Sequence, residues 1–143
     1  MLENALFIIT GYLAGSLSTA VIVCRLMNLG DPRLKGSCNP GATNVLRLYG
    51  RKAAMLALGG DLAKGILPVL LARYLGAADA VVALTGLAAF AGHLYPVFFG
   101  FRGGKGVATL LGVVIATSWI IAMLFAGTWL LVAGLFRYSS LAS

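Results

Sequence analysis

The sequence predicts an all-α protein, integral to a membrane and built as a single domain over residues 1–143, with about five membrane segments. The first observation is composition: 60% of the residues are hydrophobic and 10% are charged, whereas soluble domains carry about 25% charged residues. The second is the recurrence of apolar runs near the ~20 residues that a helix needs to cross a bilayer core. The third is charge: 11 Lys and Arg oppose 4 acidic residues and gather in the polar segments. These observations exclude a soluble or a disordered chain.

The first expected span covers residues 5–24, and we expect it to be retained because it lacks the basic start of a signal peptide. It contains Gly11-x-x-x-Gly15, a small-residue pattern that lets helices approach closely and that favours internal packing over dimerisation. The second expected span covers residues 53–71, and we expect its glycine-rich middle to interrupt it ahead of Pro68.

The remaining segments are a third span over residues 80–99 and an apolar stretch over residues 107–136. As one helix that stretch would be about 45 Å long at ~1.5 Å per residue, too long for one untilted span and too short for two full ones. We therefore expect a break near Thr117-Ser118 that gives two short helices, residues 107–117 and 119–136.

The positions of the basic residues predict the orientation of the chain. Short cytoplasmic loops are enriched in Lys and Arg. With the N-terminus outside, the two basic, glycine-rich loops at residues 25–52 and 100–106 lie in the cytoplasm with Arg137, and Arg73 lies outside. The two loops are therefore expected to share the cytoplasmic face.

The first loop holds a set of hydrogen-bond donors suited to an anion. Glycine lets the main chain approach a phosphate with its N–H groups turned inward, and an arginine fork grips two phosphate oxygens. A helix expected to begin near Thr43 would add its dipole. A solvated basic loop that orients the protein and touches anionic lipid accounts for the composition equally well. The candidate groups are the hydroxyls of Ser37 and Thr43, the amides of Asn39 and Asn44, the backbone at Gly36 and Gly41, and the guanidinium of Arg47.

The second loop, Gly103-Gly104-Lys105-Gly106, stands where a span begins, so its N–H groups and lysine can face an anion at a helix N-terminus. It is not a nucleotide-binding P-loop, because Phe99 stands at the first glycine position and a glycine follows the lysine. One such turn is a weak indication of a site. Two on one face are a stronger one.

Three ionisable residues fall inside the expected spans. Asp61 and Lys64 lie three positions apart, so they can pair on one helix face, either in a functional site or to hold helices together. For His93, we favour a structural role, donating to a backbone carbonyl near the Pro96 bend, over a general base. Phe98 stands where histidine–aspartate acyltransferases carry their acid. The two cysteines show no spacing typical of a disulfide framework or a metal site.

The sequence as a whole resembles the bacterial acyl-phosphate:glycerol-3-phosphate acyltransferase family. The matching segments are Gly36 to Asn44 with Arg47, Asp61-x-x-Lys-Gly65 with Pro68, Gly92-His93, and Phe101 to Thr109. The resemblance implies an inner-membrane enzyme that moves a fatty acyl group from acyl phosphate to glycerol 3-phosphate, giving lysophosphatidate and phosphate. It implies membrane lipids as surroundings, with no nucleic acid, cofactor or metal, and we expect a monomer.

The site residues follow from the resemblance together with the donor inventory. We expect catalytic roles for Ser37, Arg47, Lys105 and Ser140, the last beside Arg137 at the end of the chain. The expected phosphate- and substrate-binding residues are Gly36, Asn39, Gly41, Thr43, Asn44, Gly103, Gly104 and Gly106, with Asp61, Lys64 and His93 as structural or accessory residues.

The sequence departs from the family pattern in two places. Cys38 stands where the first motif usually has glycine, which crowds the loop if that position needs a positive φ. Family members also continue through two more membrane segments that carry a His and an Asn of the site, so we expect a truncated chain with little activity.

The chemistry implied by the resemblance is compatible with these residues. Acyl phosphate has a good leaving group, so orientation and charge neutralisation can carry the reaction, with a phosphate oxygen accepting the hydroxyl proton. The alternative functions are a transporter or channel for a small anionic metabolite, which predicts internal repeats that we do not find, and a scaffold for anionic lipid.

Overall fold

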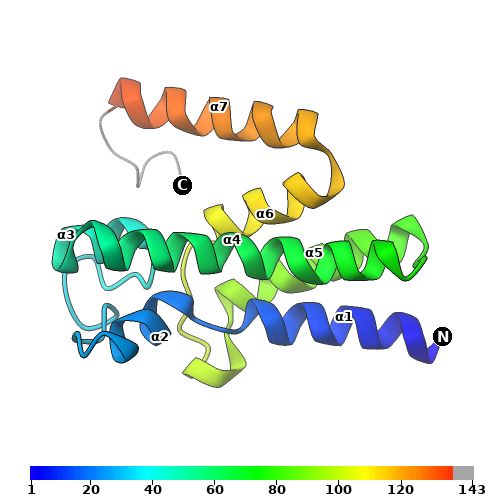
Figure 1. Cartoon of the computed structure of the whole chain (residues 1–143), viewed down its shortest axis with the longest axis horizontal. Helices are drawn as coiled ribbons and strands as arrows, with labels where there is room; N and C mark the ends of the chain where they lie inside the picture. Colours follow the sequence, from blue (N-terminus) through cyan, green and yellow to red (C-terminus); the bar gives the residue numbers. More distant parts are fainter. Residues whose placement is uncertain (137–143) are drawn as a thin grey trace.

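A computed structural model describes residues 1–136, so Arg137 and Ser140 lie outside the described residues. Over residues 1–136 the chain forms seven α-helices and one 3-10 turn, with no strand (Figure 1). The expected all-α fold is confirmed.

The expected first span is two helices, α1 (Leu2–Gly15) and α2 (Thr19–Leu26), bent by 47° relative to each other. Leu17 lies in the break between them, so its carbonyl accepts no hydrogen bond within a helix. The ammonium of Lys64 donates a hydrogen bond to that oxygen at 2.7 Å. A distant side chain therefore satisfies the backbone group that the break leaves without a helical partner.

The next two helices are α3 (Ala42–Tyr49) and α4 (Arg51–Tyr74). Helix α3 begins after Gly41, as expected near Thr43. The expected interruption of the second span is wrong, because α4 runs unbroken for 24 residues. Its glycines serve close packing instead: a side chain at Gly65 would overlap the backbone carbonyl of Thr109.

The second half of the chain contains α5 (Asp79–Leu94), the 3-10 turn η1 (Val97–Phe99), α6 (Val107–Thr117) and α7 (Trp119–Phe136). The expected break near Thr117-Ser118 is confirmed, since Ser118 has an extended backbone between the last two helices. At 11 residues, α6 is about 16 Å long, too short to cross a bilayer.

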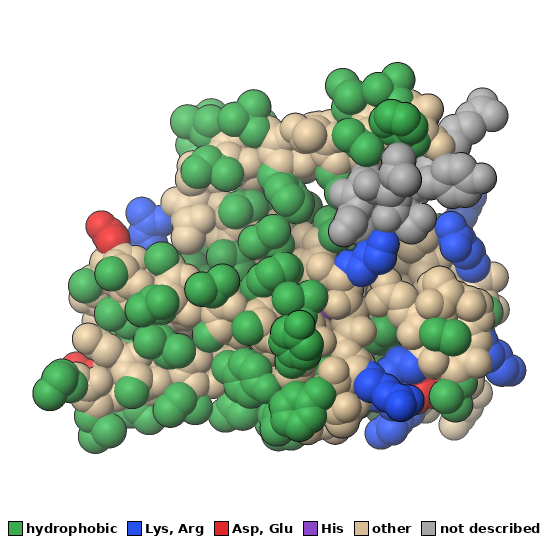
Figure 2. Space-filling view, turned by 180° about the vertical axis from the view of Figure 1, so that it is seen from behind, with side chains coloured by type: hydrophobic (Ala, Val, Ile, Leu, Met, Phe, Trp, Pro, Cys, Tyr) green, Lys and Arg blue, Asp and Glu red, His purple; other side chains and the backbone are tan. Residues whose placement is uncertain are grey.

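Within residues 1–136, three helical segments are long and apolar enough to cross a membrane, and a fourth counts if the bent α1–α2 pair is one span. The expected multi-pass helical architecture is therefore confirmed, and the expected number of about five membrane segments is not. Figure 2 shows Lys and Arg gathered toward one end of the molecule, the end formed by the loops on either side of α3. Apolar side chains cover most of the face between the ends.

Close backbone contacts hold the helices together. In α1, a side chain at Gly11 or Gly15 would overlap the carbonyl of Thr85 or Ala89 in α5, which confirms internal packing for this glycine pair. Buried side chains of α2, α3 and α4 form one apolar cluster that fixes α3 beside the start of α4: Ala20, Cys24, Val45, Ala53, Ala54 and Ala57. Helix α7 packs on α6 and buries only Ala122 (Figure 1).

Candidate functional site

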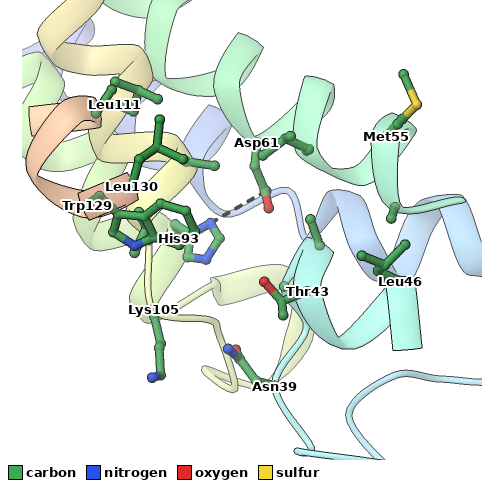
Figure 3. Close-up of a pocket in the computed structure, with 18 of the residues that line it drawn as sticks. Asn39, Thr43, Leu46, Met55, Asp61, His93, Lys105, Leu111, Trp129 and Leu130 are labelled. Carbon is green, nitrogen blue, oxygen red and sulfur yellow. Dashed lines mark ion pairs between the residues drawn. The ribbon is translucent and has the colours of Figure 1, made fainter. Parts of the chain in front are cut away.

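A cavity of about 580 Å³ lies between the two glycine-rich loops and helices α3, α4, α6 and α7 (Figure 3). Its polar lining comes from both loops and from the helices beside them, and consists of Asn39, Thr43, Arg51, Asp61, His93 and Lys105. Its apolar lining includes Leu46, Met55, Leu58, Leu111, Phe125, Trp129 and Leu130. The cavity is therefore amphipathic, with hydrogen-bonding groups beside a wall that suits hydrocarbon.

Two helix N-termini border this cavity. The first turn of α3 contributes Ala42 and Thr43, and the first turn of α6 contributes Val107 and Ala108. The first N–H groups of a helix lack intrahelical partners and carry the positive end of its dipole. The two ends therefore present positive partial charge to the same space.

The first loop takes its shape from its backbone and from Asn44. Gly36 and Cys38 both adopt the left-handed conformation, with φ of 64° and 57°. The amide of Asn44 accepts a hydrogen bond from the N–H of Ser37 at 3.0 Å and donates to the carbonyls of Pro32 and Lys35 at 2.9 and 3.1 Å. Asn44 is buried and is bonded to the loop backbone, so it shapes the loop from within.

The second loop rests on the end of α5. The N–H of Gly104 donates to the carbonyl of His93 at 3.2 Å. A side chain at Gly103 would overlap the carbonyls of His93 and Leu94. Gly106 has φ of 78°, which turns the chain into α6. Glycine is therefore required here because the loop lies against the backbone beneath it.

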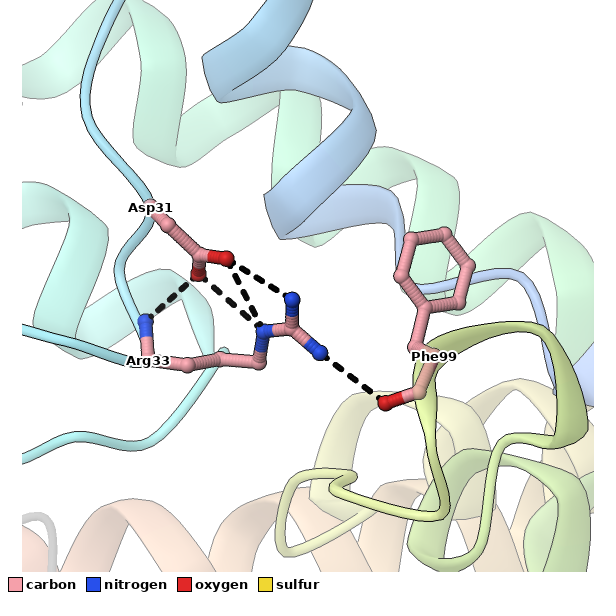
Figure 4. Close-up of polar contacts among 3 residues, drawn as sticks. All are labelled: Asp31, Arg33 and Phe99. Atoms are coloured by element: carbon pink, nitrogen blue, oxygen red, sulfur yellow. Dashed lines mark hydrogen bonds and ion pairs between the residues drawn. The ribbon is translucent and has the colours of Figure 1, made fainter.

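An arginine joins the two loops (Figure 4). The guanidinium of Arg33 binds the carboxylate of Asp31 at 2.7 Å and donates to the carbonyl of Phe99 at 3.0 Å. It also lies 5.8 Å from the centre of the Phe99 ring, with Arg25 at 6.0 Å. Hydrogen bonds from Arg33 hold the pKa of Asp31 below its usual value, and Asp31 raises the pKa of Arg33 in turn. The loop before α3 is thereby tied to the turn before α6.

Inside the helices, Asp61 is the centre of a buried polar cluster. One carboxylate oxygen accepts from the hydroxyl of Thr19 at 2.6 Å and pairs with the ammonium of Lys64 at 2.8 Å. The same oxygen lies 3.5 Å from Nδ1 of His93, and that nitrogen lies 3.0 Å from the hydroxyl of Thr109. The expected Asp61–Lys64 pair is therefore present, and it joins helices α2, α4, α5 and α6.

His93 does not make the hydrogen bond that was expected of it. Its Nδ1 contacts Thr109 and Asp61, and among residues 1–136 its Nε2 has no hydrogen-bond partner. No hydrogen bond therefore runs from its ring to a backbone carbonyl near Pro96. The hydroxyl of Tyr12 donates to the carbonyl of Tyr95 at that bend instead, at 2.8 Å.

The structure brings many of the expected site residues together and leaves others outside the cavity wall. Those that line it are Asn39, Gly41, Thr43, Asp61, His93, Lys105 and Gly106. Those that do not line it are Gly36, Ser37, Asn44, Arg47, Lys64, Gly103 and Gly104. Ser37 and Arg47 are exposed, and Ser140 lies outside the described residues. Sequence reasoning missed Arg51, whose signal was a basic residue at the start of a span.

These features define a multi-pass helical membrane protein with a cavity that can hold an amphiphilic anion. The family model for glycerol-3-phosphate acyltransferase matches residues 5–143. The chain belongs to the glycerol-3-phosphate acyltransferase family.

Two curated relatives and a solved structure illustrate the match. The glycerol-3-phosphate acyltransferase of Legionella pneumophila is 58% identical over 136 residues, which cover 95% of this chain and 49% of the relative. That of Hydrogenovibrio crunogenus is 59% identical over 132 residues, covering 92% and 63%. The chain thus spans about half to two thirds of the length of these relatives. The crystal structure of PlsY, an integral membrane glycerol 3-phosphate acyltransferase, in its glycerol 3-phosphate form has a TM-score of 0.90 and 43% identity, over 98% of this chain and 70% of that one.

Proposed function

We propose that this protein transfers a fatty acyl group from acyl phosphate to glycerol 3-phosphate, releasing lysophosphatidate and inorganic phosphate. The observation that carries the proposal is the cavity, whose polar lining comes from both glycine-rich loops and continues into an apolar wall. An acyl phosphate has the same two parts, a phosphate head and a hydrocarbon chain. The proposal places the enzyme in the bacterial inner membrane as a monomer, with the basic loop end in the cytoplasm.

The phosphate groups bind at the polar lining. Lys105 supplies an ammonium, Thr43 and Asn39 supply neutral donors, and the N-termini of α3 and α6 supply backbone N–H groups. Arg51 adds a guanidinium that can take two phosphate oxygens at once. Two anionic substrates repel each other, so this concentration of positive charge is what allows both to bind together.

Ser37 and Arg47 act at the edge of the same site. Arg47 follows Thr43 by four positions in α3, so the two side chains lie on one helix face, and Ser37 stands two positions before Asn39. Both side chains are exposed at the loop end of the molecule. Ser140, in the proposal, contacts glycerol 3-phosphate from the last segment of the chain.

The reaction needs orientation and charge neutralisation more than a reactive side chain. A hydroxyl oxygen of glycerol 3-phosphate attacks the acyl carbonyl carbon, the bond from that carbon to the phosphate oxygen breaks, and the hydroxyl proton passes to a phosphate oxygen. Lys105 and the loop N–H groups stabilise the charge that develops on the leaving phosphate. The apolar wall holds the acyl chain out of water and fixes the carbonyl near the loops.

The test is an assay of the full-length protein, purified in detergent, with glycerol 3-phosphate and either acyl phosphate or an acyl thioester as donor. We expect phosphate release and lysophosphatidate with acyl phosphate and little product with the thioester. Uptake of glycerol 3-phosphate into proteoliposomes without acylation would identify a transporter and contradict the proposal.

A further inference from the structure

His93 presents an unused polar atom to the cavity. The residue is 6% exposed and lines the cavity wall (Figure 3). Among residues 1–136, Nε2 is one of two buried side-chain polar atoms without a hydrogen-bond partner. A buried group of this kind costs about 1–3 kcal/mol when it is left unsatisfied, so its position needs a reason.

The opposite side of the imidazole is held by its neighbours. Nδ1 lies 3.0 Å from the hydroxyl of Thr109 and 3.5 Å from the carboxylate of Asp61. Thr19 and Lys64 hold that carboxylate in turn. A carboxylate beside Nδ1 favours the tautomer with the proton on Nδ1, because the N–H then points toward negative charge. Nε2 is left as a hydrogen-bond acceptor.

The backbone of Gly104 packs directly against the Nε2 edge of the ring. A side chain at Gly104 would overlap Nε2 of His93 and would lie 3.2 Å from the side-chain oxygen of Asn39. Glycine at this position therefore lets His93 and Asn39, two polar side chains from different elements, lie close together, and both line the cavity.

We propose that Nε2 of His93 accepts a hydrogen bond from a hydroxyl of glycerol 3-phosphate and orients the alcohol for acylation, while Asp61 and Thr109 fix the ring. The inference rests on the proposed function and adds a contact to it. Of the two proposed substrates, only glycerol 3-phosphate has hydroxyl donors, whereas ionised acyl phosphate offers acceptors alone. An acceptor nitrogen at this position therefore recognises the alcohol and not the acyl donor.

Two substitutions separate this role from a structural one. In His93→Asn the side-chain amide reaches the place of Nδ1, so the contacts to Thr109 and Asp61 can persist while the cavity-facing atom is lost. In His93→Gln the longer amide reaches the place of Nε2 and keeps a polar atom toward the cavity. Binding of the alcohol through Nε2 predicts that His93→Asn is the more damaging of the two. A purely structural role through Nδ1 predicts the reverse order.

The experiment measures kcat and KM for each substrate in the full-length protein, with melting temperature in detergent as a check of folding. We expect His93→Asn to lower kcat/KM for glycerol 3-phosphate at least about tenfold, while KM for acyl phosphate stays nearly constant. We expect kcat/KM for glycerol 3-phosphate to be at least about fivefold higher in His93→Gln than in His93→Asn. An analogue that lacks the second hydroxyl, 3-hydroxypropyl phosphate, locates the contact. If the loss disappears with this analogue, His93 binds the second hydroxyl, and the proton of the reacting hydroxyl passes to a phosphate oxygen. If the loss persists, His93 binds the reacting hydroxyl, and the proton of that hydroxyl passes to Nε2 instead.

Either location supports the inference, and two results would overturn it. One is a folded His93→Asn protein with wild-type kinetics for glycerol 3-phosphate. The other is an equal change in KM for both substrates. If the unaltered full-length protein shows no acyl transfer, the proposed function fails, which is a different outcome from an active enzyme that is insensitive to His93→Asn.

Discussion

Cys38 holds a backbone conformation that suits glycine better than cysteine. Its φ is 57°, in the left-handed region, where a side chain costs roughly 1–2 kcal/mol. Glycine avoids that cost, but its greater backbone freedom stabilises the unfolded chain by about 0.5–1 kcal/mol, which offsets part of the benefit. We therefore predict that Cys38→Gly raises the stability of the protein by up to about 1 kcal/mol, measured as melting temperature in detergent. Cys38→Ala keeps the β-carbon and serves as the control, and an equal gain from alanine would show that backbone strain is not the cause.

Lys105 is the charged side chain of the second loop in the cavity wall. Removal of one preorganised donor to developing charge costs about 2.7–4 kcal/mol in enzymes that work this way. We predict that Lys105→Ala lowers acyl transfer at least about a hundredfold in the full-length protein, with little change in melting temperature because the side chain is exposed in a loop. Turnover near that of the unaltered enzyme would remove Lys105 from the mechanism.

The sequence predicted which residue types form the site better than it predicted where their side chains point. Thr43, Asn39 and Lys105 line the cavity as expected. Asn44 was expected to face a phosphate, but its amide turns inward because the loop backbone at Gly36 and Cys38 brings three of its own polar groups around it. Such a direction depends on backbone angles that a list of donors does not contain.

At the level of helices, glycines in α4 differ in what surrounds them. A side chain at Gly65 would overlap the carbonyl of Thr109, whereas nothing lies within 4 Å of one at Gly59. We predict that Gly65→Ala destabilises the protein by about 1–3 kcal/mol, because α6 must move away. Gly59→Ala, in the same helix, should be neutral or stabilising by up to about 1 kcal/mol. Thermal unfolding of the two variants tests this, and equal effects would show that the α4–α6 contact is not tight.

The salt bridge between Asp31 and Arg33 predicts a pH dependence of stability. The folded pKa of Asp31 is lowered from 3.8, so its contribution is complete above that value and is lost as the pH falls through the lower folded pKa. We predict that Asp31→Asn has a lower melting temperature than the unaltered protein at pH 6, and that the difference shrinks below about pH 4. A difference that stays constant down to pH 2 would contradict the assignment.

Breaks in helices were predictable where length alone demands them. The break at Ser118 follows from a stretch that fits neither one span nor two. The break before Thr19 was missed because the apolar pattern of residues 5–24 is continuous, and the break is stabilised by Lys64 from a distant helix. The glycines of α4 led to the opposite error, a predicted interruption in a helix that is continuous. Tertiary contacts, and not local propensity, decide whether such glycines interrupt a helix.

For the whole molecule, the gathering of basic residues at the loop end predicts its orientation (Figure 2). Cys38 is exposed in the first loop, and Cys24 is buried, so one cysteine of the two can report the side. We predict that a membrane-impermeant thiol reagent leaves Cys38 unlabelled in intact spheroplasts and labels it after lysis. Cys38→Ser identifies the labelled site, and labelling without lysis would place the loops outside.

The short helix α6 has a consequence for the membrane as an electrical barrier. Helix α6 begins near Asp61, which lies ten residues, or about 15 Å, along α4 from Arg51. It ends near Arg73, whose guanidinium donates a hydrogen bond to the carbonyl of Ala116 at 3.2 Å. Loop and cavity lie alongside α4 from Arg51 to Asp61. With water in the cavity, we expect the potential across the membrane to fall mainly over the ~16 Å of α6, about half of an ordinary ~30 Å core. We therefore expect insulation here to depend on the close fit of α6 against α4, where a side chain at Gly65 would overlap the carbonyl of Thr109.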